Sequence, residues 1–279
     1  MVKRVRPWAA AVCCIWIWAG PGAAQVACSE IVDMVTVWAD VRGVEVEFGP
    51  QSRFDDAMQG CTATDATIRF DSAPLVLTAE RISVEGVTLE AWVRGAAQDP
   101  GILVVQAEGL SPLGAGRAWD FGAQVGWDRA KGRLVIAEGE VRGPADATLL
   151  SLRGALRLAD LAVDALHMRA EGRGAFDALV LPLLARESPE AWSGALATGL
   201  EALPEEVAPR ESRVALAGWL AQAGPDAGGL TLVLRTGAPL EVAPLLAALR
   251  GEGALGPALA GGALQAWFEP PAAEGQAGE

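Results

Sequence analysis

Apolar and polar positions alternate with a period of two along much of the first half of the chain. In residues 66–95, Ile68 and Phe70 fall on one side of this pattern, and residues 101–110 form another short apolar run. Runs of this period that are broken by Asp, Gly and Pro are typical of half-buried strands in an antiparallel sheet. The pattern therefore predicts a series of hairpins.

The clearest hairpin covers residues 126–143, "GWDRAKGRLVIAEGEVRG". An apolar strand ends at Trp127, and a second apolar run begins at Leu134. Gly132, in the polar segment between them, can adopt the positive φ that such a turn requires. Because antiparallel hairpins commonly place one face in a core and one in water, we interpret this segment as scaffold.

The period changes after Pro144. Residues 146–172 are ambiguous between strand and helix, with a strand favoured up to about Leu158. Residues 213–224 predict a short helix or strand, and residues 228–251 return to strand before ending in a helix.

Residues 175–203 predict helix. Ser188 is suited to the N-cap and Pro189 to the first helical position. Four apolar residues then recur at helical spacing: Trp192, Leu196, Leu200 and Leu203.

Strands followed by helices indicate a β-rich α+β fold. We expect a curved antiparallel sheet of hairpins in a single domain over residues 25–268. A helical insertion is expected at about 175–222, and residues 269–279 have the composition of a disordered tail.

The first 24 residues have the layout of a secretory signal peptide. A basic start precedes an apolar segment of about a dozen residues, and Gly22 and Ala24 occupy the positions of a cleavage site. We therefore expect export to the periplasm. A retained N-terminal anchor and a lipoprotein site at Cys28 are the alternatives. No later segment has the length of apolar sequence that a transmembrane helix needs, so we expect no span after removal of the signal.

Two cysteines, Cys28 and Cys61, remain after signal removal. In an exported chain they most simply form a disulfide, with two free thiols as the alternative. Neither lies in a CxxC motif, so the sequence indicates neither zinc binding nor thiol redox catalysis.

The chain is acidic, with a formal net charge of −13. Loss of the signal, which holds three basic residues and no carboxylate, makes it more acidic still. Such a charge repels nucleic acid and anionic lipid head groups, so we expect no nucleic-acid partner. An acidic surface could instead meet a basic envelope partner.

No motif predicts a catalytic residue, a cofactor or a metal. Residues 251–256, "GEGALG", match a dinucleotide-binding pattern, but a predicted helix precedes them where the motif needs a strand. His167 is the only histidine, and no GxSxG segment accompanies it and the nearby Asp160 and Asp164. We interpret it as structural.

The adjacent carboxylate pairs, Asp55–Asp56 and Glu205–Glu206, lie in segments rich in turn-forming residues. A solvated surface is their default interpretation, and a hydrolase with an unrecognised acid pair is the alternative. Tryptophans on a curved sheet can line a ligand groove, although they more often fill a core. Three are the groove candidates: Trp92, Trp119 and Trp127.

The segment "FGAQVGWDRAKGRLVIAEGEVRG", followed by "TLLSLRGALRLADL", resembles the strand–turn–strand texture of AsmA-like and YdgA-like bacterial envelope proteins. The resemblance covers residues 119–162, and a weaker similarity to the same pattern occurs at residues 228–243. It implies a periplasmic, non-enzymatic role in the cell envelope and the handling of lipid in an apolar groove. Our leading hypothesis is therefore a non-catalytic envelope protein that binds an apolar ligand or lipid. The alternatives are an acidic adaptor and the hydrolase.

Overall fold

The structure is a computed structural model. It describes residues 28–271 apart from 41–43, 51–52, 56–59, 72–74, 88, 90, 92–100, 114–116, 129, 144–147, 158–161, 185–187 and 223–227. The predicted signal and the last eight residues therefore lie outside the described residues, as do Trp92, Asp56 and Asp160.

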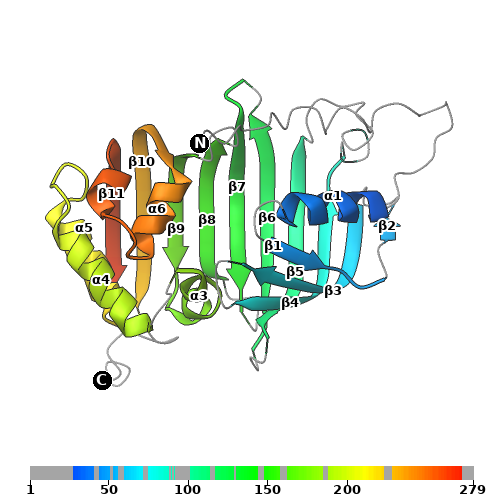
Figure 1. The fold of residues 1–279 in the computed structure, drawn as a ribbon, viewed down its shortest axis with the longest axis horizontal. Coiled ribbons are helices and arrows are strands. Elements are labelled where there is room, and N and C mark those ends of the chain that lie inside the picture. The colour runs from blue at the N-terminus through cyan, green and yellow to red at the C-terminus, as the bar shows by residue number, and fades with distance from the viewer. Residues whose placement is uncertain are drawn as a thin grey trace, which may run out of the picture.

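The strands form one antiparallel sheet (Figure 1). They are β1 (Val44–Glu47), β2 (Arg53–Asp55), β3 (Gly60–Phe70), β4 (Val76–Glu85), β5 (Ile102–Pro112), β6 (Trp119–Asp128), β7 (Arg133–Arg142), β8 (Thr148–Arg157), β9 (Ala162–Ala170), β10 (Gly229–Glu241) and β11 (Gly262–Glu269). From β3 to β11 each strand pairs with the next in sequence, while β1 and β2 both pair with β3. The predicted order of hairpins is confirmed, but the sheet is not strongly curled (Figure 1).

Most helices follow β8, which confirms the β-rich α+β class. They are α1 (Cys28–Asp40), the π-helical turn η4 (Phe176–Val180), α3 (Leu181–Leu184), α4 (Pro189–Glu201), α5 (Arg210–Leu220), α6 (Val242–Leu249) and α7 (Leu255–Ala258). The segment from η4 to α5 lies within the stretch predicted to be helical.

Two local predictions are confirmed at the level of single residues. Gly132 adopts a φ of 59° in the turn between β6 and β7, where the Lys131 N–H donates to the Asp128 carbonyl at 3.2 Å. Ser188 caps α4, because its Oγ accepts a hydrogen bond from the Ala191 N–H at 3.1 Å.

Helix α1 is the element that the sequence pattern missed. Residues 33–48 contain alternating valines, yet the chain is helical to Asp40 and extended only from Val44. The ambiguous residues 213–224 are also helical at their start, in α5.

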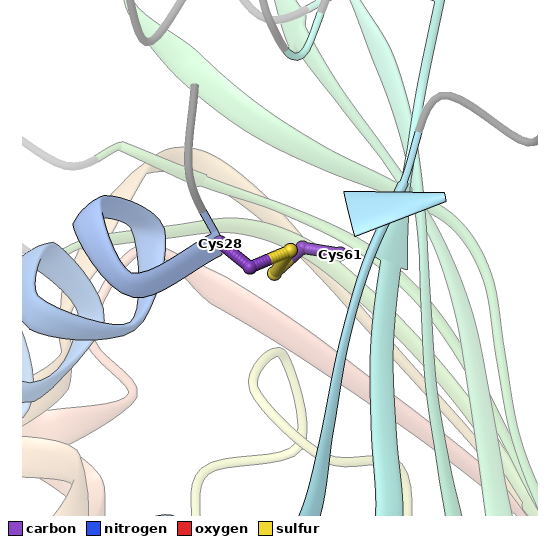
Figure 2. The surroundings of a disulfide bond; sticks show 2 residues. All are labelled: Cys28 and Cys61. Carbon is purple, nitrogen blue, oxygen red and sulfur yellow. A yellow bond between two sulfur atoms is a disulfide. The ribbon is translucent and has the colours of Figure 1, made fainter. Parts of the chain in front are cut away.

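A disulfide joins Cys28, the first residue of α1, to Cys61 in β3, as predicted (Figure 2). Their Cα atoms are 5.5 Å apart, and both residues are buried. Ile31 of α1 and Leu89 complete this small buried cluster. The bond therefore fixes the start of α1 to the sheet.

The outer edge of β11 is protected by the α4–α5 region. The Leu264 N–H donates to the Val207 carbonyl at 2.7 Å, and the Ala266 N–H donates to Ser212 Oγ at 3.1 Å. These bonds satisfy edge groups that would otherwise be open to pairing with another chain.

Arg173, in the loop after β9, ties the sheet to α5. It donates two hydrogen bonds to Asp177 Oδ1, at 3.0 and 2.7 Å, and one to the Leu220 carbonyl at 2.9 Å. It also donates to the Gln222 carbonyl. The guanidinium lies 5.3 Å from the centre of the Trp219 ring, so this buried cation has partners on several sides.

In the part of the chain that the structure describes, no helix has the length and hydrophobicity needed to cross a membrane.

Candidate ligand-binding face

The strand register gathers apolar residues on one face of the sheet. One row crosses it from β3 to β11 through Cys61, Val84, Val105, Ala123, Gly139, Leu152, Met168, Leu232 and Ala266. A parallel row, two residues away in every strand, consists of Ala63, Ile82, Ala107, Phe121, Val141, Leu150, Ala170, Leu230 and Phe268. Because residues two apart share a face of a strand, both rows belong to one side, which we call the apolar face.

The row between these two points to the other side, which we call the polar face. It consists of Thr62, Ser83, Gln106, Gly122, Glu140, Ser151, Arg169, Thr231 and Trp267. Arg69 is paired there with Glu47 at 2.8 Å, and this hydrogen bond raises the pKa of the Arg69 guanidinium. A hydrogen bond to Glu171 likewise raises the pKa of Arg169. These exposed ion pairs indicate that the polar face is solvated.

The helices lie in front of the sheet in Figure 1 and cover the two ends of the apolar face. At one end, Ile31 of α1 packs with Val84 and Leu103. At the other end, residues of α4 to α7 form the largest buried cluster with β9, β10 and β11. Between them, Ala175 and Leu179 at η4 pack in one cluster with Trp119 and Val141.

On the apolar face of β5 to β8, six apolar residues larger than alanine lie outside all four buried clusters of the described chain. We call them the central strip: Val105, Val125, Trp127, Leu134, Ile136 and Leu152. Their side chains are half-buried. They are continuous with the covered parts of the apolar face, because Val105 is paired with Val84 and Leu134 with Leu156.

Two small, buried residues lie between the larger residues of the central strip. Ala123 and Gly139 face each other across β6 and β7, between the larger residues of the strip. A methyl group at Gly139 would meet Ile136 Cγ2 at 3.5 Å and Leu152 Cβ at 3.7 Å, which is ordinary contact. Ile136 and Leu152 therefore already pack around Gly139, and the strip is a continuous apolar surface.

The three tryptophans predicted to line a ligand groove have different surroundings. Trp127 is half-buried in the central strip. Trp119 is on the same face of β6 but only 4% exposed, in the cluster beneath η4, and among the described residues its indole N–H has no hydrogen-bond partner. The third candidate, Trp92, lies outside the described residues.

The other polar candidates are not brought together. His167 is exposed in β9. Asp164 Oδ2 lies 3.8 Å from Arg133 Nη1. The side chain of Asp55 and the whole of Asp56 lie outside the described structure. Within the described ranges, no group of three or more His, Cys, Asp or Glu residues has a metal-binding arrangement.

Two further motifs have structural explanations. Glu205 accepts hydrogen bonds from the Arg210 N–H at 2.9 Å and from Arg213 at 2.7 Å, so it stabilises the start of α5. The glycine-rich residues 251–256 follow helix α6 instead of a strand, as their sequence context predicted. The dinucleotide motif therefore lacks the strand it requires.

The chain matches no protein-family model, and neither a curated protein nor a solved structure shows significant similarity to it.

Proposed function

We propose that this protein is an exported, non-catalytic protein of the bacterial cell envelope that binds the acyl chain of a lipid on the central strip. The observation that carries the proposal is the strip itself. It is a connected apolar surface on a face whose two ends are covered by helices.

The chemistry of the strip favours hydrocarbon over other ligands. All six of its side chains are apolar, so a polar ligand would lose its bonds to water without replacement there. Each methylene group removed from water contributes about 0.8 kcal/mol, so an acyl chain gains affinity along its length. Strands β5 to β8 together provide a width of roughly 14 Å, at about 4.8 Å between neighbouring strands.

The amino-terminal sequence supports the same proposal. Its basic start, apolar segment and small residues at 20–24 predict export, and the periplasm adjoins membranes that supply lipid. The central strip has no titratable side chain to act as acid, base or nucleophile, so binding is the role that we assign to it.

Neighbouring residues of β7 provide a matched test. Ile136 belongs to the strip, whereas Val135 is half-buried on the polar face. Ile136→Gln places an amide against the acyl chain, and we expect it to weaken the binding of palmitoyl lysophosphatidylcholine at least tenfold by calorimetry. Val135→Gln should leave the affinity unchanged. Equal affinities for the two variants, or no binding by the unmodified protein, would contradict the proposal.

A further inference from the structure

Two buried indole groups have no hydrogen-bond partner among the described residues, Trp119 Nε1 and Trp219 Nε1. Buried N–H groups are almost always paired in folded proteins, because water that is lost on burial must be replaced by another acceptor. An unpaired donor in a native fold therefore requires an explanation, and a ligand that supplies the acceptor is one.

Trp119 is placed to serve a ligand on the central strip. It begins β6, and its side chain is on the same face as Ala123, Val125 and Trp127, because these positions are separated by even numbers of residues. Four residues of extended strand separate it from Ala123, a distance of roughly 13 Å. An elongated ligand could therefore lie along β6 with one end at each tryptophan.

The surroundings of Trp119 restrict the group that can accept its hydrogen bond. Its buried neighbours are apolar and include Leu77, Val141 and Leu179. A carboxylate or phosphate would be placed against these apolar side chains, and burying a charge is far more costly than burying a neutral oxygen. Because the indole N–H can only donate, the matching group is a neutral acceptor such as an ester carbonyl.

The element that covers Trp119 is a single π-helical turn. It continues directly into α3, and Ala175, just before it, and Leu179 both pack in the cluster that contains Trp119. π-Helical turns are uncommon and are frequent at functional sites. Entry of a carbonyl group beneath η4 requires this turn to shift.

We propose that Trp119 Nε1 is the polar anchor of the lipid site and donates a hydrogen bond to the ester carbonyl of the bound acyl chain. This inference rests on the proposed function. It adds the ligand class, a neutral acyl ester, and assigns η4 as the cover over the carbonyl end.

Trp219 provides the control. It is 2% exposed, its ring lies edge-on to Phe176 at 5.0 Å, and Arg173 stacks over it. It is in α5, which packs on β10 and β11, and it belongs to the large cluster at that end of the sheet, whereas Trp119 belongs to a separate cluster. Its contact with the proposed cover is through Phe176, the first residue of η4. Trp219→Phe therefore removes a comparable buried donor without touching the proposed anchor.

The test compares two lipids that differ at one group. Palmitoyl lysophosphatidylcholine has an ester carbonyl, and hexadecyl lysophosphatidylcholine has an ether in its place. By calorimetry below their critical micelle concentrations, the unmodified protein should bind the ester about five to ten times more tightly, the effect of one hydrogen bond. Trp119→Phe should abolish this preference without weakening the binding of the ether, and Trp219→Phe should retain it.

The outcomes separate the two proposals. Equal binding of ester and ether by the unmodified protein would overturn the anchor and leave the strip intact. No binding of either lipid would overturn the proposed function itself. A similar loss of preference in both tryptophan variants would also overturn the anchor, because it would show a general effect of perturbing the core. Thermal unfolding of Trp119→Phe should occur at or above the temperature of the unmodified protein, since the change removes an unsatisfied donor.

Discussion

Arg173→Met, a change at the buried arginine that joins the end of β9 to α5, should be strongly destabilising. The Arg173 side chain is only 4% exposed, and methionine can keep its apolar length while removing every donor. Asp177 would lose two hydrogen bonds from the guanidinium, and the carbonyls of Leu220 and Gln222 would each lose one. The polar link that Arg173 makes between the end of β9 and the end of α5 would then be lost.

The expected magnitude follows from the burial of the pair. Removing one partner of a buried ion pair costs about 3–5 kcal/mol, because the remaining charge is left without compensation. The Asp177 side chain is 26% exposed and keeps part of its hydration, so the lower end of this range applies. We expect a loss of about 3 kcal/mol in the free energy of unfolding.

Urea unfolding of Arg173→Met, Asp177→Asn and the double variant measures this loss and the coupling between the two residues. The double variant should be less destabilised than the sum of the single changes. Arg153→Met is the control, since Arg153 and Glu138 form an exposed pair at 3.2 Å and such pairs contribute about 1 kcal/mol or less. A loss below about 1 kcal/mol for Arg173→Met would refute the reasoning, because it would equate the buried and the exposed pair.

Two further changes test how the sheet is secured at its ends. Ser212→Ala leaves the buried Ala266 N–H at the β11 edge unpaired, so it should lower the free energy of unfolding by about 1–3 kcal/mol. Urea titration measures this loss. An unchanged midpoint would show that another acceptor replaces the hydroxyl. Joint replacement of Cys28 and Cys61 by serine should cost about 3–4 kcal/mol from the 33-residue loop that the disulfide closes, and hydrogen exchange should rise first in α1. Unchanged exchange in α1 would show that its packing alone holds the helix.

The sheet could be predicted from the sequence because its signal is local. Alternation in β6 and β7 and the glycine at position 132 specify a hairpin without reference to the rest of the chain. Likewise, Ser188 and Pro189 specify the start of α4 through bonds made within one turn.

Helix α1 could not be predicted in the same way. Its valines favour extended structure, and local preference is weak enough for tertiary contacts to override it. The disulfide to Cys61 and the burial of Ile31 are contacts with residues distant in sequence. Only the folded sheet brings them to α1.

The candidate site was partly visible in the sequence. Trp119 and Trp127 stand at positions of the same parity in one strand, and this parity places them on a common face. Which of them a helix covers depends on where η4 packs, and this is not encoded near β6. The pair of small residues at the centre of the strip also depends on register, because Ala123 and Gly139 become neighbours only when β6 and β7 pair.

The central claim is that the apolar face binds lipid, and native mass spectrometry tests it most directly. The full chain would be expressed with its amino-terminal segment in a bacterial host, purified from the periplasm without detergent, and analysed before and after organic extraction. The account predicts a protein mass increased by one acyl lipid, a return to the bare mass on extraction, and loss of the adduct in Ile136→Gln but not in Val135→Gln. A bare mass for the unmodified protein, both as isolated and after incubation with palmitoyl lysophosphatidylcholine, would contradict it.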